Sequence, residues 1–94
     1  GVTAVVCGTD TQAYGVLQEA RVAGVRMPQD LAVAGFDDLP YSATSNPSLT
    51  SVHLPAVPLG RKAGQQLREL MEGIELEEPH VTLDSSLVVR GSTG

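Results

Sequence analysis

The sequence is poor in cysteine, in aromatic residues and in basic residues, and each shortage excludes a class of function. Its 94 residues include one cysteine, no tryptophan, one phenylalanine and two tyrosines. A single thiol, Cys7, forms neither an internal disulfide nor a cysteine-based metal cluster, and its apolar run Ala4–Cys7 favours a buried structural thiol. Six Lys and Arg against eleven Asp and Glu give a net charge of −5, which leaves no basic patch for DNA in these residues.

Long apolar runs and familiar catalytic motifs are also absent. No run approaches the ~20 apolar residues of a membrane span, and the N-terminus lacks the basic segment of a signal peptide. The sequence has no glycine-rich nucleotide motif, no nucleophile elbow and no histidine pair at zinc-binding spacing. A phosphoacceptor domain would need a lysine after a late strand, whereas the only lysine, Lys62, falls inside an expected helix. We therefore expect no enzyme, no cofactor and no metal.

The first half has the pattern of a strand–helix–strand unit in one small domain. Continuous β-prone runs at Val2–Cys7 and Leu31–Phe36 predict strands covered on both faces, as in a parallel sheet. Between them, Thr9 and Gln12 have the spacing of a capping box at the start of a helix of about 12–14 residues. A right-handed crossover of this kind makes the two strands parallel.

The second half predicts a third strand at Leu49–His53, a linker at Leu54–Pro58, and a second helix from near Pro58 to Gly73. Proline suits the first turn of a helix, and glycine suits its end. The apolar face of this helix comprises Leu59, Ala63, Leu67, Leu70, Met71 and Ile74.

Two short strands should close the chain, at His80–Leu83 and Leu87–Arg90. The glutamate-rich stretch Glu69–Glu78 is interpreted as a solvated face and loop. Together these elements predict an α/β fold, a parallel sheet with flanking helices.

Polar side chains follow the carboxyl ends of three expected strands. They are Thr9 and Asp10, Asp37 and Asp38, and His53. Ligands of open α/β sheets bind outside these ends. Adjacent residues of an extended chain point to opposite sides, so Asp37 can face the crevice while Asp38 caps the following turn. A carboxylate there would accept hydrogen bonds from a sugar or a nucleoside. The alternatives stay open: turn and cap roles for both aspartates, helix capping by Thr9 and Asp10, and a structural role for His53.

Several segments together resemble a known family. They are Thr3–Asp10, Ala13–Leu17, Ala23–Asp38, Pro47–Val52, Leu59–Ala63 and Leu87–Thr93. In order and spacing across the whole chain they resemble LacI/GalR-type transcriptional repressors, which share an apolar strand ending in Gly-Phe-Asp-Asp. The resemblance implies an effector domain like that of periplasmic sugar-binding proteins (type I), with the effector held between two α/β subdomains.

The resemblance also implies how this chain divides. Residues 1–53 and 86–94 would belong to the C-terminal subdomain, and residues 54–85 would be a crossover that packs on an N-terminal subdomain outside this sequence. The chain is thus expected to be an incomplete domain, the C-terminal part of a cytoplasmic bacterial regulator. Such a regulator would form a dimer and contact DNA only through a helix-turn-helix that these residues do not include.

Particular residues gain roles from the same resemblance. Asp37 would contact effector hydroxyls or a purine, and Thr9 occupies a position where many members carry a ligand-contacting asparagine. His53, at the end of the third strand, completes the candidate ligand set. The positions that resemble the family's dimer interface are Tyr14, Leu39, Pro40 and Tyr41.

Two other classes of function stay open. A free-standing periplasmic-type sugar-binding protein shares the fold, and a signal peptide without an upstream helix-turn-helix would favour it. An α/β enzyme with Asp37 as acid or base is the third reading, and turnover that is lost on Asp37→Ala would support it.

Overall fold

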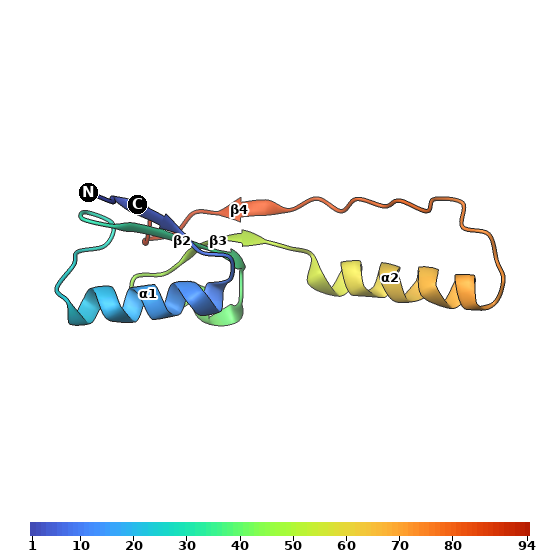
Figure 1. The fold of residues 1–94 in the computed structure, drawn as a ribbon, viewed down its shortest axis with the longest axis horizontal. Coiled ribbons are helices and arrows are strands. Elements are labelled where there is room, and N and C mark those ends of the chain that lie inside the picture. The colour runs from blue at the N-terminus through green and yellow to red at the C-terminus, as the bar shows by residue number, and fades with distance from the viewer. The chain divides into compact units, whose positions relative to one another are not determined.

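The computed structural model describes residues 1–94 and divides them into two compact units. Unit 1 comprises residues 1–53 and 86–94, and unit 2 comprises residues 54–85. Unit 2 contains the helix α2 (Ala56–Met71) and the segment that follows it (Figure 1). The elements of unit 1 are β1 (Ala4–Val6), α1 (Asp10–Val22), β2 (Ala32–Asp37), the 3-10 helix η1 (Pro40–Ala43), β3 (Thr50–His53) and β4 (Ser86–Val88).

Helix α1 begins at the predicted capping box. Thr9 has an extended backbone (φ −145°), and its hydroxyl accepts a hydrogen bond from the backbone N–H of Gln12 at 3.2 Å. The side-chain oxygen of Gln12 accepts in turn from the N–H of Gly8 at 3.1 Å. The helix is 13 residues long and ends before Gly24, whose φ of +73° suits the left-handed turn after a helix. The predicted helix and its cap are both confirmed.

The four strands of unit 1 form one sheet in the order β1-β2-β3-β4. Strand β1 is parallel to β2, with Ala4 opposite Ala32. Strand β2 is parallel to β3, and this pair ends with Asp37 opposite His53. The predicted α/β fold is confirmed, and these three strands have the predicted parallel arrangement.

Two details of the C-terminal prediction were wrong. The sheet is mixed, because β4 is antiparallel to β3. The chain returns to the sheet beside the residue at which it left, with Ser86 opposite His53, so β4 runs back along β3. Residues 80–83 form no strand. A β-prone composition needs a neighbouring strand for its hydrogen bonds, and only Ser86–Val88 pair with β3.

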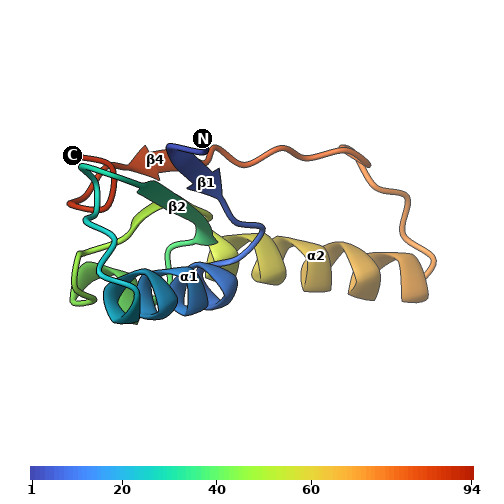
Figure 2. The same cartoon turned by 60° about the vertical axis from the view of Figure 1, so that its left-hand side comes forward.

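The core of unit 1 lies between α1 and one face of the sheet, along which α1 runs (Figures 1 and 2). Its buried members are Ala13, Leu17, Val33 and Leu49. Two of them, Ala13 and Leu17, belong to the apolar stripe predicted for α1. Cys7 packs against this cluster partly buried, and burial raises the pKa of its thiol, as expected of a structural cysteine.

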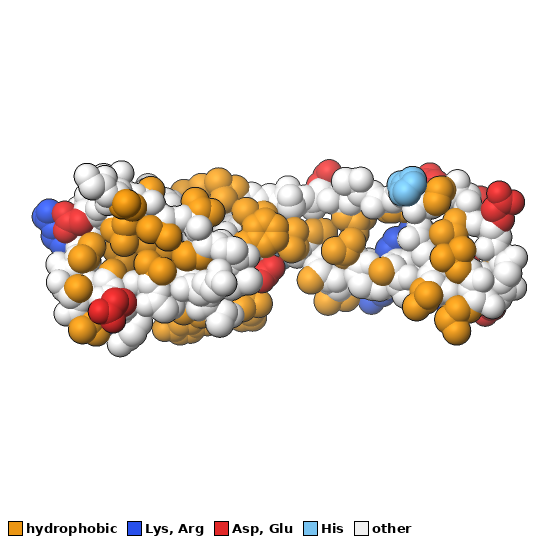
Figure 3. Space-filling model, viewed as in Figure 1, with side chains coloured by type: hydrophobic (Ala, Val, Ile, Leu, Met, Phe, Trp, Pro, Cys, Tyr) orange, Lys and Arg blue, Asp and Glu red, His pale blue; other side chains and the backbone are white.

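The opposite face of the sheet is open. Side chains alternate along a strand, so Val6, Phe36 and Leu87 share the face turned away from Val33. Val6 is 82% exposed and Leu87 is 61% exposed. The prediction that the strands are covered on both faces is therefore wrong for this chain. Figure 3 shows how much apolar side-chain surface the chain leaves exposed.

Unit 2 contains the second predicted helix. Helix α2 begins at Ala56, close to Pro58 as predicted, so the end of the predicted linker is helical. Pro58 then lies in the first turn, where its missing N–H removes no helical hydrogen bond. Met71 ends the helix and Gly73 follows at φ +76°, the predicted stop. No residue of α2 is buried, so its apolar face is exposed in this chain. Neither helix combines the length and apolarity required to cross a membrane.

Candidate functional site

The carboxyl ends of β2 and β3 bring two predicted site residues together. Asp37 ends β2, His53 ends β3, and the two are direct partners in the strand register. This edge of a parallel sheet is where α/β proteins bind ligands. Thr9 lies at the start of α1 and its hydroxyl is engaged by Gln12, and it makes no hydrogen bond to Asp37 or His53.

The backbone at Asp37 and Asp38 is held in an unusual conformation. Both residues have positive φ, at +112° and +54°. Such angles cost a non-glycine residue about 1–3 kcal/mol each and persist only where the surroundings enforce them. The half-buried carboxylate of Asp37 makes no hydrogen bond and no ion pair within the chain, so its oxygens are free to accept bonds from a ligand.

The neighbouring Asp38 pairs with Arg90 and His53 at the same edge. Its Oδ1 lies 2.7 Å from Nη2 of Arg90, and its Oδ2 lies 3.0 Å from Nδ1 of His53. Burial raises the pKa of the Asp38 carboxyl, but the hydrogen bonds from Arg90 and then His53 outweigh burial and hold the pKa below its ordinary value. The two adjacent aspartates therefore differ in role, because Asp38 pairs with Arg90 and His53 whereas Asp37 has no partner within the chain.

His53 is a partner of Asp38 and remains open on its other side. Its side chain is 52% exposed, and only Nδ1 is engaged within the chain. The bond from Nδ1 fixes the orientation of the ring. Nε2 is therefore available at the same edge as the Asp37 carboxylate.

Arg90 was not singled out from the sequence. It lies just beyond β4, and its Nη1 donates to the backbone oxygen of Leu49 at 2.8 Å while Nη2 faces Asp38. Its side chain is only 17% exposed. One signal could have found it: Arg90 is the only Lys or Arg after Arg68, and it follows an apolar strand. A lone cation in that setting indicates a carboxylate partner.

Asp10 has a different position from the one expected of a helix cap or a ligand contact. It is completely buried. Its Oδ2 accepts from the N–H of Leu39 at 2.8 Å and from the hydroxyl of Ser42 at 2.5 Å, and its Oδ1 accepts from the hydroxyl of Ser51 at 2.6 Å. The glycine at position 35 leaves room for it, because a Cβ there would collide with Asp10 Oδ1. Asp10 is therefore a satisfied internal carboxylate that a ligand does not reach.

The residues expected at a dimer interface include two tyrosines whose rings are in contact. The rings of Tyr14 and Tyr41 meet edge to face, with centroids 4.9 Å apart at 81°. The hydroxyl of Tyr14 lies 2.7 Å from that of Ser42, while Tyr41 is 55% exposed. Leu39 and Pro40, both exposed, lead into η1 beside them. A depression of about 190 Å³ adjoins the pair, lined by Tyr14, Leu17, Gln18, Arg21, Tyr41, Ser45 and Asn46.

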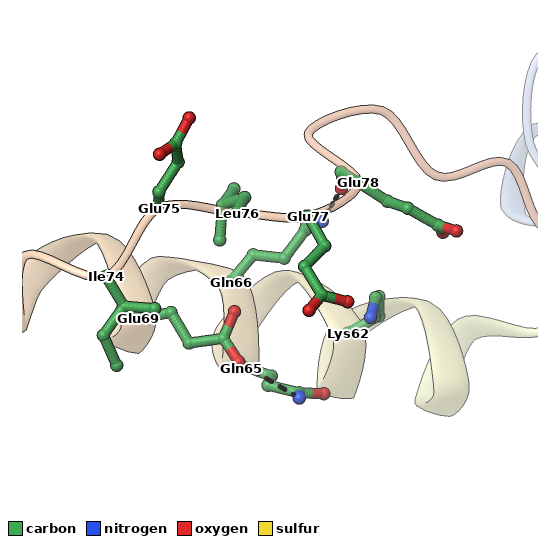
Figure 4. Close-up of a pocket in the computed structure, with 9 residues that line it drawn as sticks. All are labelled: Lys62, Gln65, Gln66, Glu69, Ile74, Glu75, Leu76, Glu77 and Glu78. Carbon is green, nitrogen blue, oxygen red and sulfur yellow. Dashed lines mark hydrogen bonds between the residues drawn. The ribbon is translucent and has the colours of Figure 1, made fainter.

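A larger hollow, of about 510 Å³, lies within unit 2 between α2 and the segment after it. Its lining is mainly charged and amide side chains: Lys62, Gln65, Gln66, Glu69, Ile74, Glu75, Leu76, Glu77 and Glu78. Figure 4 shows Glu77 extending toward the helix, whereas Glu75 extends away from it. No cluster of His, Cys, Asp or Glu in the chain has the grouping of a metal site. The glutamates that line this hollow therefore do not form a metal site.

The sequence profile of the periplasmic binding protein-like domain matches residues 2–93. The chain belongs to this family. The HTH-type transcriptional regulator MalR of Streptomyces coelicolor is 41% identical over 91 residues, 97% of this chain and 26% of the relative. The crystal structure of the transcription regulator CcpA of Lactococcus lactis covers all of this chain and 35% of its own, with a TM-score of 0.92 at 33% identity. A LacI family regulator from Lactobacillus casei with bound sucrose covers 96% of this chain and 33% of its own, with a TM-score of 0.82 at 32% identity.

These findings confirm the resemblance to LacI/GalR-type regulators for this periplasmic binding protein-like domain. The relatives are regulators of transcription, not enzymes. The chain spans about a quarter of the length of the curated relatives that it matches.

Proposed function

We propose that this periplasmic binding protein-like domain is the effector-sensing and dimerising part of a bacterial LacI-type transcription regulator. In this proposal Asp37 binds a small polyhydroxylated molecule, a sugar or a nucleoside. The observation that carries the proposal is the unpaired Asp37 carboxylate, which stands on a positive-φ turn at the ligand-binding edge of a parallel sheet.

The chemistry of this edge suits neighbouring hydroxyl groups. An ionised carboxylate accepts hydrogen bonds on both oxygens, and such charge-assisted bonds are stronger than neutral ones. Arg90 compensates the charge of Asp38, so Asp37 does not face an unpaired neighbour. The free Nε2 of His53 and the hydroxyl of Thr9 are the further contacts that we propose. The sucrose bound by the similar Lactobacillus casei regulator supports the sugar class.

We also propose that unit 2 crosses to a second subdomain of the complete gene product. The apolar face of α2, including Leu59, Leu67 and Leu70, is exposed in this chain. A helix with one apolar face needs a partner for that face. On this proposal DNA is bound by a helix-turn-helix elsewhere in a cytoplasmic regulator, with no metal or cofactor in these residues.

The proposed dimer surface consists of Tyr14, Leu39, Pro40 and Tyr41. Aromatic residues with a packed ring and an exposed edge are typical of the centres of protein interfaces. The Tyr14–Tyr41 contact and the neighbouring depression have this character. Sedimentation velocity of Tyr41→Ala checks this role: a dissociation constant raised at least about tenfold supports it, and an unchanged dimer contradicts it.

The experiment that tests the ligand proposal is calorimetric titration of the complete gene product with saccharides, sucrose among them, and with nucleosides. We expect saturable binding of one class, and chromatography should recover the ligand unchanged. Two results would oppose the proposal: no binding by any member of either class, or chemical turnover of the ligand. Turnover would instead favour an acid–base role for Asp37.

A further inference from the structure

The turn that carries Asp37 needs an external restraint. Asp37 and Asp38 have consecutive positive φ angles, a combination that neither residue prefers. The turn has no glycine of its own, since Phe36 precedes it and Leu39 follows it. Its conformation must therefore be enforced by neighbouring groups.

Two buried side chains supply that restraint. The hydroxyl oxygen of Ser51 accepts a hydrogen bond from the N–H of Asp38 at 3.0 Å, and the same hydroxyl donates to Oδ1 of Asp10 at 2.6 Å. The other oxygen of Asp10 accepts from the N–H of Leu39 at 2.8 Å. Asp10 and Ser51 are both completely buried. The two backbone N–H groups that follow Asp37 are thus held by one internal pair.

The pair is itself rigidly located. Asp10 is the first residue of α1, where a carboxylate is favoured by the helix dipole. Ser51 lies in the middle of β3, opposite Gly35 of β2, whose lack of a side chain makes room for Asp10. Helix and sheet therefore fix both ends of the restraint, as a preorganised binding site requires.

We infer that Asp10 and Ser51 are positioning residues for the Asp37 carboxylate, which binds the effector. They hold the turn so that Asp37 presents its carboxylate at the edge of the sheet without touching the ligand themselves. This inference rests on the proposed function, in which Asp37 binds the effector. It assigns to Asp10 a role beyond its place in the first turn of α1 and to Ser51 a role beyond its place in β3.

Ser42 provides a matched control for Ser51. Both are completely buried serines that donate their hydroxyl to Asp10. Only Ser51 accepts from a backbone N–H of the turn, because the other hydroxyl partner of Ser42 is Tyr14. Removing Asp10 itself would unpair both serines and threaten folding, so the test uses the serines.

The test compares Ser51→Ala with Ser42→Ala in the complete gene product by residue-resolved amide hydrogen exchange. Ser51→Ala should speed exchange at the Asp38 amide about tenfold, because its hydrogen bond is lost, whereas Ser42→Ala should leave that amide unchanged. An unchanged Asp38 amide in Ser51→Ala, or an equal change in both variants, would overturn the inference.

A second measurement connects the turn to binding, with sucrose as the probe. Ser51→Ala should weaken sucrose binding about tenfold and Ser42→Ala less than twofold, even where both lower the melting temperature alike. Equal losses in the two variants would mean that Ser51 is only structural. If the wild type does not bind sucrose, the saccharide or nucleoside that it binds in the titration replaces sucrose as the probe, and the exchange result decides independently whether Ser51 holds the turn.

Discussion

Asp37 and Asp38 are adjacent in the sequence, but their carboxylates meet different surroundings. Asp38 is bound by Arg90 and His53, and Asp37 has no partner in the chain. The positive φ angles of the turn separate the two side chains. One aspartate therefore maintains the edge of the sheet and the other is left available to a ligand.

A prediction at the residue scale concerns Gly35. Gly35→Ala should lower the free energy of unfolding by about 1–3 kcal/mol, the usual range for overpacking, because the new Cβ would meet Asp10 and lie 3.0 Å from Leu49 Cδ2. Urea unfolding measures the change. Gly15→Ala is the control: nothing lies within 4 Å of its Cβ, and alanine in a helix should add about 0.5–1 kcal/mol. A Gly35→Ala variant as stable as the wild type would contradict the packing described for Asp10.

A second prediction concerns the pH dependence of Asp38. Its folded-state pKa lies below the value of about 3.9 expected in the unfolded chain. The stabilisation from its ion pairs is therefore complete above that value and is lost as pH falls through the folded pKa. Asp38→Asn should be less stable than the wild type at pH 6, and the difference should shrink toward pH 3. Urea unfolding at each pH checks this, and a constant difference across that range would contradict the assignment.

At the scale of elements, α1 has a dual function at its N-terminus. It places Thr9 at the cap and Asp10 in the interior. Thr9→Ala should cost about 1 kcal/mol, because the N–H of Gln12 loses its acceptor. Thr9→Ser, which keeps the hydroxyl, should cost much less. Thermal unfolding compares the two, and equal losses in both variants would show that the hydroxyl does not stabilise the helix.

Elements with local signals could be predicted from the sequence, whereas those set by distant partners could not. The capping box and apolar stripe of α1 are encoded within the helix itself, and β1 and β2 follow from continuous apolar runs. The direction of β4 depends on where the chain re-enters the sheet, and residues 80–83 lack a neighbouring strand. Neither fact is visible in local composition.

The candidate site shows the same division. Asp37 and His53 could be identified because ligands bind outside the carboxyl ends of parallel strands, and these ends share one edge of the sheet. That rule did not identify Arg90, nor the bonds from Asp10 to Leu39 and Ser51. These contacts join residues 29–52 positions apart in the sequence, and no periodicity or motif links such residues.

At the scale of the whole molecule, the acidic composition of the chain does not favour DNA binding, although its relatives are regulators of transcription. The net charge of −5 and the absence of a basic patch describe these residues only. The chain matches about a quarter of the length of its regulator relatives. The exposed apolar faces of the sheet and of α2 are consistent with the proposal that other parts of a larger protein cover them.

The central claim is that Asp37 binds the effector, and calorimetric titration of the Asp37→Ala variant tests it most directly. The complete gene product is titrated with the saccharide or nucleoside that the wild type binds. Asp30→Ala is the matched control, because the carboxylate of Asp30 is already engaged by Arg26. We expect Asp37→Ala to weaken ligand binding about 10–100-fold, as loss of charge-assisted hydrogen bonds does, with its melting temperature and ligand-free DNA affinity near the wild type. Ligand affinity equal to that of the wild type and Asp30→Ala would contradict the account and leave Asp37 a structural residue.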